Sequence, residues 1–187
     1  MKKFALLIVV LAVSTTLLAQ TNWIADKAHS KIGFSVRHLV LSDVDGNFGE
    51  FEAHLSSSKE DFSDAVFEIS IYVASINTDN ESRDKDLKSD NYFDVAKYPR
   101  IKFKSTSIRK TGNKNYKLTG NLTMHGVTKT VTFNLTLSSG QGTDHKPVAG
   151  FKATGTLSRT EFGIGTVPRA MIGDEITIKA NGEFVQQ

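Results

Sequence analysis

Apolar and polar residues alternate along most of this chain, and this alternation constrains its fold more than any other feature. The clearest run covers residues 65–73, where every second residue is apolar from Ala65 to Val73. A second run places four apolar residues between Val131 and Leu137, separated by threonines and an asparagine. A period of two is typical of β-strands that bury one face. The sequence therefore predicts an all-β protein.

Turn-forming residues divide the chain into about eight such strands. Clusters of Gly, Asn, Ser and Thr at residues 111–113 and 138–140 are typical of the connections. The alternation breaks at Gly49, which predicts a bulge or bend there. Only one segment favours a helix: residues 78–81 fit a capping box, and good helix formers continue to Lys88. With no internal repeat and no low-complexity linker, we expect a single domain.

Eight strands with one apolar face each must hide those faces from water. They can do so between two stacked sheets or inside a closed barrel. Closure removes the exposed sheet edges that otherwise invite aggregation. A barrel of eight strands can be filled by side chains or can hold one small ligand. The alternation alone does not choose between these outcomes.

The N-terminus carries a different signal. Lys2 and Lys3 precede an apolar run from Phe4 to Val13, and the segment ends at the small residue Ala19. This pattern predicts a secretory signal peptide at residues 1–19, cleaved near Ala19, and a mature domain at residues 20–187. An uncleaved anchor is the alternative, but a membrane span needs roughly 20 apolar residues. We expect a periplasmic or secreted protein.

Composition narrows the choice of partners. Removing the two lysines of the signal peptide changes the balance from 23 basic and 20 acidic residues to 21 and 20. A nearly neutral domain without a basic stretch argues against a nucleic-acid partner. The protein has no cysteine, so its stability in an oxidising compartment depends on packing and not on disulfides.

Catalytic and metal-binding patterns are weak. The five histidines (His29, His38, His54, His125 and His145) have neither the H-x-H nor the H-x-x-x-H spacing that puts two ligands on one face. No G-x-S-x-G nucleophile elbow is present, and the glycines at 163 and 165 lack the context of a phosphate loop. We therefore expect no metal, no cofactor and no catalytic residues.

The aromatic content is more informative. Eleven of the 12 phenylalanines lie beyond the signal peptide, and most fall on the apolar strand faces. They could fill the barrel as a solid core, or they could line an apolar channel. Small residues on the same faces, among them Gly120, Ala153 and Gly155, favour some open space.

Six blocks of residues, in order along the sequence, resemble the YceI-like family of polyisoprenoid-binding lipid carriers. They are Asp26-x-x-His29-Ser30 with Phe34-x-Val36-Arg37-His38; Gly46-x-Phe48-x-x-Phe51; Ser75-Ile76-Asn77-Thr78 with Arg83-Asp84, Leu87, Tyr92-Phe93-Asp94-Val95 and Tyr98-Pro99-x-Ile101-x-Phe103; Gly120-x-Leu122-Thr123-x-His125-Gly126-Val127-Thr128-Lys129; Ser158-Arg159-x-Glu161-Phe162-Gly163; and Gly173-Asp174-Glu175-Ile176.

The resemblance implies an extended, lipocalin-like antiparallel barrel of eight strands with one short helical insertion. It also implies that a long isoprenoid or similar amphipathic chain lies in the apolar interior, and that the protein is exported to the periplasm. One position departs from the family. Asp86 stands where the family often has His, which could change the preference for a ligand head group.

We therefore expect a non-enzymatic protein that binds a polyisoprenoid or another long-chain amphipathic lipid, for transport or storage. The alternation predicts the lining residues on the apolar strand faces: Phe34, Val36, Phe48, Phe67, Ile69, Ile71, Phe103, Leu122, Phe133, Leu135 and Phe151. A register error of one residue would invert a whole strand. Arg37, Arg83, Lys88 and Arg159 could contact an anionic head group, although solvated surface charge is the simpler role for each.

Two alternatives stay open. One is an enzyme of lipid or isoprenoid metabolism with His125 or His38 as general base. The other is a solid barrel that serves as a structural or stress-response partner protein. Transient membrane contact is compatible with transport and with storage of a lipid. Val66, Tyr72 and Ile76 could form the face of a homodimer. The sequence does not distinguish a quinone, a polyprenyl phosphate, a fatty acid or its amide as ligand.

Overall fold

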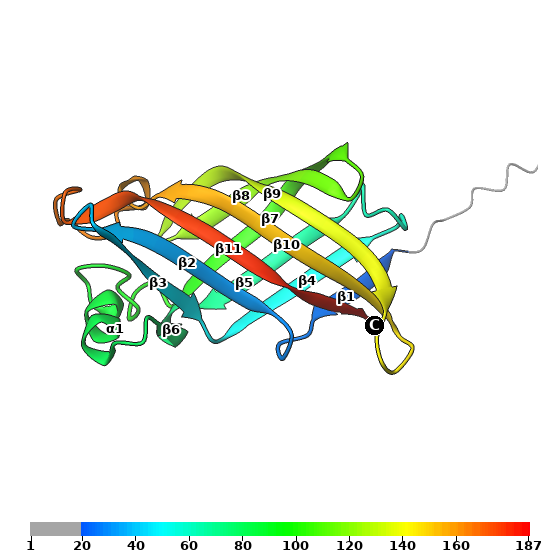
Figure 1. Ribbon diagram of the computed structural model, residues 1–187, viewed down its shortest axis with the longest axis horizontal. Coiled ribbons are helices and arrows are strands. Elements are labelled where there is room, and N and C mark those ends of the chain that lie inside the picture. Colours follow the sequence, from blue (N-terminus) through cyan, green and yellow to red (C-terminus); the bar gives the residue numbers. More distant parts are fainter. Residues whose placement is uncertain (1–19) are drawn as a thin grey trace, which may run out of the picture.

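Eight antiparallel strand positions close into an elongated barrel (Figure 1). The structure is a computed structural model, and it describes residues 20–187. The predicted signal peptide at residues 1–19 lies outside the described residues. The prediction of an all-β, eight-stranded antiparallel barrel with one short helical insertion is confirmed.

Three of the strand positions consist of two segments separated by a bend. Strands β1 (Thr21–Ala25) and β2 (Lys31–His38) form the first, β3 (Ser42–Phe48) and β4 (Phe51–Ser57) the second, and β5 (Val66–Tyr72) and β6 (Ile76–Asn77) the third. β1 pairs with β4 while β2 pairs with β3, so each bend is matched across the pair. The bend predicted at Gly49 falls between β3 and β4.

The other five positions are long, continuous strands. They are β7 (Arg100–Gly112), β8 (Asn115–Met124), β9 (Val127–Gln141), β10 (Pro147–Ser158) and β11 (Ile172–Gln186). β11 closes the barrel because its free edge pairs with β2 in its first half and with β1 in its second. Closure gives each of these long strands a neighbour on both sides, although the second half of β7 pairs with β8 alone.

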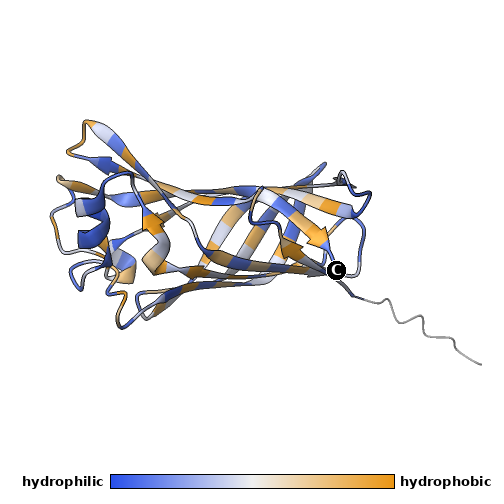
Figure 2. Cartoon of the chain, turned by 90° about the horizontal axis from the view of Figure 1, so that it is seen from below, coloured by the Kyte–Doolittle hydropathy of each residue, from blue (hydrophilic) through white to orange (hydrophobic). Residues whose placement is uncertain are grey.

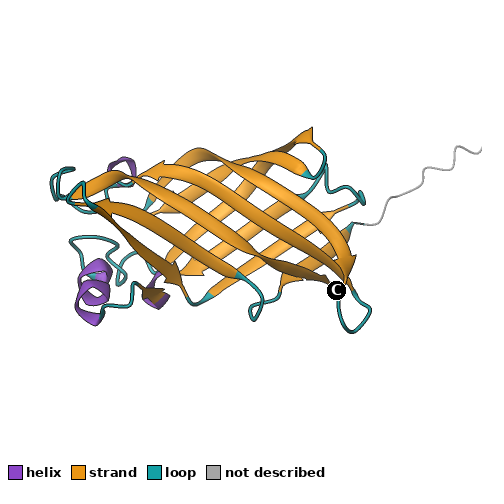
Figure 3. Ribbon diagram, viewed as in Figure 1, coloured by secondary structure: helices purple, strands orange, loops and turns teal. Residues whose placement is uncertain are grey.

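The helical segments lie toward one end of the barrel (Figure 3). Helix α1 (Glu81–Lys88) belongs to the connection between β6 and β7, and two 3-10 turns occur at Val73–Ser75 and Thr160–Phe162. The N-cap of α1 is Asn80, whose side chain accepts a hydrogen bond from the Arg83 amide. The predicted capping box began two residues too early: Thr78 instead donates to the Asp84 carboxylate. None of the helices in residues 20–187 is long and apolar enough to cross a membrane.

The far half of the barrel, around β1 and the C-terminus of the protein, is solidly packed. Apolar and polar residues alternate along its strands (Figure 2), and the inward rings meet in pairs. The rings of Phe67 and Phe151 lie 5.9 Å and 5.0 Å from the ring of Phe184, which is almost fully buried. Trp23 packs on Phe62 at 5.6 Å. These edge and tilted contacts fill that half with side chains.

The surface proposed for a homodimer is not a continuous apolar face. Ile76 is buried with 2% of its surface exposed. The ring of Tyr72 is covered by the Arg100 guanidinium at 3.6 Å, and its hydroxyl donates to Glu52. The alternation placed Ile76 on the outer face because it did not detect the 3-10 turn at Val73–Ser75, which reverses the parity of β6.

Candidate functional site

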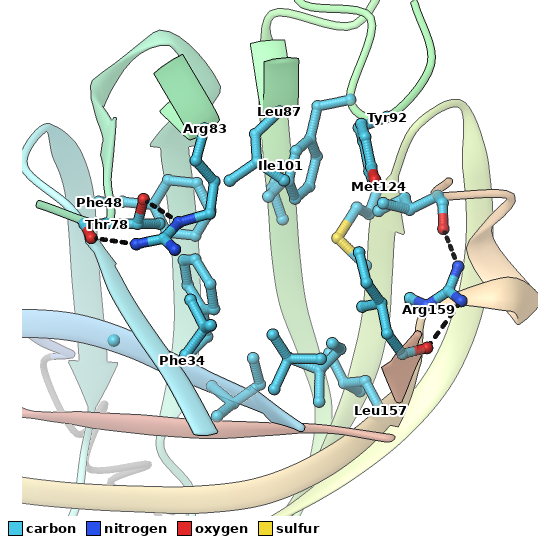
Figure 4. A pocket seen from close by; sticks show the side chains of 18 of the residues that line it. Phe34, Phe48, Thr78, Arg83, Leu87, Tyr92, Ile101, Met124, Leu157 and Arg159 are labelled. Carbon is cyan, nitrogen blue, oxygen red and sulfur yellow. Dashed lines mark hydrogen bonds between the residues drawn. The ribbon is translucent and has the colours of Figure 1, made fainter. Parts of the chain in front are cut away.

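A cavity of about 710 Å³ occupies the half of the barrel nearest α1 (Figure 4). Strands β2, β3, β8 and the first half of β11 supply much of its wall, and α1 with the segment that follows it covers one side. The lining is mostly apolar, and its polar members lie beside α1, at the end of β2 and at Arg159. Its volume falls within the range of roughly 300–1,000 Å³ that small-molecule sites occupy.

Six of the eleven residues predicted to line a ligand site line this cavity: Phe34, Val36, Phe48, Ile71, Leu122 and Phe133. They come from five strands, and all point inward because the alternation places them on the concave face. Contact of these residues with a ligand stays a prediction.

The other five predicted residues do not line the cavity. Phe67 and Phe151 pack on Phe184 in the solid half, and Leu135 is buried with 3% exposure. Phe103 is buried against Phe133. Ile69 pairs with Phe103 on the adjacent strand and packs against the same core. Alternation identifies the inward face of a strand, but it contains no information on depth along the barrel axis.

The cavity ends on an aromatic pair. Phe103 and Phe133 meet edge-on with ring centroids 5.6 Å apart. A Cβ on Gly120 would lie 2.6 Å from the Phe103 ring, and a Cβ on Gly155 would lie 2.5 Å from the Phe133 ring. The two glycines that suggested open space are therefore covered by rings. Their absent side chains make room for the aromatic floor, not for a ligand.

Three groups of lining residues were not predicted from the sequence. Leu87, Tyr92 and Phe93 come from α1 and the segment after it, and Phe93 meets Phe48 edge-on at 6.3 Å. Ile172, Ile176 and Ile178 come from β11. The third group consists of the other apolar lining residues, which are Ile32, Val44, Ile101, Met124, Leu157 and Ile164. Ile176 and Ile178 alternate with polar residues in the sequence, so these two could have been included. The insertion has no period of two and gave no such signal.

Arg83 and Arg159 reach the cavity from opposite sides (Figure 4). Arg83 is tied to Thr78, since its Nε donates to the Thr78 hydroxyl at 2.8 Å and one Nη donates to the Thr78 carbonyl at 2.7 Å. Its remaining N–H groups are available for a ligand. Asp86 lies one turn further along α1 and also lines the cavity.

Arg159 is not solvated surface charge, the simpler role that its sequence position suggests. It is buried with 3% exposure, and its Nε donates to the Gly173 carbonyl. Its two Nη atoms donate to four more carbonyls at 2.8–3.0 Å, those of Ile164, Gly165, Val167 and Ile172. Because all five donors of a guanidinium are used, Arg159 holds the segment before β11 in place and has no N–H left for a head group.

The other two predicted head-group partners differ from each other. Arg37 lines the cavity, but its Nε pairs with Asp43 at 2.8 Å across the β2–β3 hairpin. Lys88 ends α1 and does not line the cavity. Tyr92 adds a neutral polar group: burial, reinforced by the charge of Asp86, raises the pKa of its phenol, so the hydroxyl stays protonated.

Comparison with known proteins fits this geometry. The family model described as the YceI-like domain matches residues 23–184, nearly the whole barrel. The chain belongs to the YceI-like family. A UPF0312 protein of Staphylococcus aureus strain USA300 is 33% identical over 171 residues, which cover 88% of this chain and 97% of that relative.

Solved structures of YceI-like proteins share the barrel. The Campylobacter jejuni YceI protein is 31% identical, with a TM-score of 0.74 over 87% of this chain and 96% of its own. BcnA of Burkholderia cenocepacia is 25% identical, with a TM-score of 0.78 over 85% of this chain and 98% of its own. A polyisoprenoid-binding domain from Saccharophagus degradans has a TM-score of 0.65 at 12% identity, over 89% of this chain and 98% of its own, and shares the fold alone.

The histidines of this YceI-like barrel do not assemble into one centre. His125 occupies the β8–β9 turn, where its ring lies 4.7 Å from that of Tyr98 and its Nδ1 is 3.2 Å from the Phe162 carbonyl oxygen. His38 lines the cavity mouth. Within residues 20–187, only Asp26, His29 and Glu183 bring three donor atoms within 4.8 Å of one another, and none of the three lines the cavity. His29 and Asp26 already pair there at 2.7 Å.

Proposed function

We propose that this YceI-like protein binds a polyisoprenoid or similar long-chain amphipathic lipid, with the tail in the cavity and the head at the mouth beside α1. The observation that carries the proposal is the apolar cavity of about 710 Å³, walled by aliphatic and aromatic side chains from both the barrel and the insertion. Such a site has no need of a precisely placed polar anchor, because the tail itself provides the binding energy.

The energetics are sufficient. Burying one methylene contributes roughly 0.8 kcal/mol, so about ten buried carbons would contribute on the order of 8 kcal/mol. Ordering the lipid tail and losing its free motion cost part of this. A site that depends on methylene burial selects its ligand by length and shape more than by chemistry.

The aromatic floor limits the length of tail that the cavity accepts. Phe103 and Phe133 stand between the cavity and the packed half, where the rings of Phe67 and Phe151 pack on Phe184. A tail longer than the cavity must either leave part of its length at the mouth or displace the Phe133 ring. We therefore expect the tightest binding for those long-chain lipids whose tails end at the Phe133 ring.

The mouth favours a head group that can both accept and donate hydrogen bonds. The free N–H groups of Arg83 would donate, while Asp86 and the Tyr92 hydroxyl would accept. The negative charge of Asp86 at this position disfavours a multiply charged head such as a pyrophosphate. An alcohol, an amide or a singly charged head fits better.

Family membership supports binding in preference to catalysis, and the related fold from Saccharophagus degradans is described as a polyisoprenoid-binding domain. We propose that the protein is non-enzymatic. It is exported after cleavage near Ala19 to the periplasm or the exterior, where it transports or stores its lipid and touches the membrane transiently. A homodimer, if it forms, needs a face other than the one that includes the buried Ile76.

Native mass spectrometry with organic extraction tests the proposal. Protein purified from a bacterial periplasm is expected to carry a long-chain lipid that extraction releases. Val36→Trp fills the cavity and should abolish the lipid adduct, whereas Val66→Trp places the same side chain on the outer face of β5 and should retain it. Protein that carries no lipid, and that does not bind added farnesol or the apolar probe N-phenyl-1-naphthylamine, would refute the proposal.

A further inference from the structure

Large exposed apolar side chains gather at one end of the barrel. Leu39, Val40 and Leu41 form the turn between β2 and β3, with 46%, 68% and 83% of their surface exposed. Met171, just before β11, is 50% exposed. We call these four residues the apolar tip. Among residues 20–187 the remaining large exposed apolar residue is Ile24, on β1 at the opposite end.

The residues of this turn do not suit its backbone conformation. Leu39 and Val40 both have positive φ, at 50° and 60°, and the Leu41 amide donates to the His38 carbonyl at 3.0 Å. A hairpin turn with two positive φ angles favours Asn-Gly, and a β-branched residue is a clear outlier there. Apolar side chains are therefore kept at this turn at the expense of backbone preference, which points to a role outside folding.

The apolar tip lies on the rim of the lipid cavity. The Leu39 amide donates to the Met171 carbonyl at 2.8 Å, which joins the two parts of the tip. The next residues inward on each strand, His38 and Ile172, pair with each other and both line the cavity. Figure 1 shows the β2–β3 hairpin and the segment before β11 at the same end as α1.

The charges beside the tip are already neutralised. Arg37 pairs with Asp43 at 2.8 Å, and Arg169 pairs with Asp174 at 3.3 Å. A partner that meets this surface therefore finds apolar side chains flanked by closed ion pairs, not a basic patch. That chemistry fits the hydrocarbon boundary of a bilayer and does not require anionic lipid.

We propose that the apolar tip inserts into the surface of a lipid bilayer and holds the cavity mouth against it, so that lipid passes between bilayer and barrel without crossing water. This inference rests on the proposed function and assigns the docking site for it. A second copy of the protein is a poorer occupant, because four side chains on a projecting turn fall far short of the roughly 20–30 residues that a stable interface uses on each side.

Vesicle flotation tests the docking site. The processed protein, checked by mass spectrometry to lack residues 1–19, is mixed with phosphatidylcholine vesicles at low and high salt. The wild-type protein should float with the vesicles, and salt should change the bound fraction less than twofold. The double variant Leu39→Asn with Val40→Gly should bind at least about tenfold more weakly, since each buried aliphatic side chain is worth that much or more. Its melting temperature should be unchanged or higher, because Asn-Gly relieves the turn.

Ile24→Ser is the matched control, since it removes an exposed apolar side chain from the other end of the barrel. Equal loss of vesicle binding in this control would overturn the proposal, as would wild-type protein that stays at the bottom of the gradient. Binding that needs anionic lipid and disappears in salt would also overturn it. A dimer lost in the double variant would show that a second copy occupies the tip instead.

Binding of N-phenyl-1-naphthylamine in the absence of vesicles separates this proposal from the proposed function. The double variant should bind the probe as the wild type does, because none of the four tip residues lines the cavity. If the wild-type protein floats but does not bind the probe, the docking surface stands and the lipid cavity fails. If it binds the probe but does not float, the reverse holds.

Discussion

Phe103 and Phe133 meet edge-on across the strand that separates them, with ring centroids 5.6 Å apart and planes inclined by 77°. Phe133 faces the cavity, whereas Phe103 is buried beneath it. The separating strand carries Gly120 between the two rings. The pair is therefore the boundary between the open and the packed halves of the barrel, and it sets the depth of the site.

Removal of the Phe133 ring should deepen the cavity. Phe133→Ala is expected to shift binding toward longer polyprenols in a series of increasing length, because the tail can then reach Phe103. It should also lower the free energy of unfolding by about 3 kcal/mol, as usual for truncation of a phenyl group in a core. Phe151→Ala, in the packed half, should cost a similar amount of stability without any shift in the preferred length. A common shift in both variants would contradict the assigned boundary.

Gly120→Ala should destabilise the barrel. A Cβ at this position would lie 2.5 Å from the Lys104 carbonyl oxygen and 2.6 Å from the Phe103 ring, and the backbone atom has little freedom to move. We expect a loss of about 2 kcal/mol in urea unfolding. Gly140 has nothing within 4 Å of the same virtual atom. Gly140→Ala should therefore be neutral or gain about 0.5 kcal/mol, and equal losses at both glycines would refute the steric explanation.

Much of the fold could be predicted from the sequence because a β-barrel encodes its inside and outside locally. Phe34, Ile71 and Phe133 face inward as their alternation indicates. The bend at Gly49 was visible because parity failed there. Ile76 was assigned to the wrong face because the 3-10 turn before it shifts the alternation and leaves no pattern of its own in the sequence. In a short strand, alternation is the only signal of which face a residue occupies.

The extent of the site could not be predicted in the same way. Whether an inward phenylalanine meets open space or another ring depends on the strand opposite, and Phe151 meets Phe184 by a register that only the closed barrel defines. The structural role of Arg159 could not be predicted either. Its five acceptors are backbone carbonyls, which leave no trace in the side-chain sequence.

Asp64 should make stability depend on acidic pH. Its burial raises the pKa of the carboxyl, but hydrogen bonds from Ser57 and Ser58 outweigh this effect and lower the pKa to about 2 from the usual 3.8. A folded-state pKa below the unfolded one contributes stability above pH 4, and this contribution is lost as pH falls toward 2. Asp64→Asn should therefore unfold more easily at pH 7, and its difference from the wild type should shrink between about pH 4 and pH 2. Asp90→Asn, at an exposed position, should show no such convergence in the same denaturation series.

Arg159→Lys should weaken the wall of the cavity even though it keeps the charge. Lysine has three donors on a single nitrogen, so at least two of the five carbonyls that the guanidinium now satisfies would be left buried without a partner. We expect a loss of about 3 kcal/mol in the free energy of unfolding. Amide exchange should also become faster in residues 164–172, because Arg159 binds four of the carbonyls in this segment. Arg169→Lys is the matched control, because its guanidinium is 69% exposed and forms a surface ion pair with Asp174. It should change stability by less than about 0.5 kcal/mol. If the two variants proved equally stable, or if exchange in residues 164–172 stayed slow in Arg159→Lys, the segment before β11 would have to be held by its own packing and not by the buried arginine.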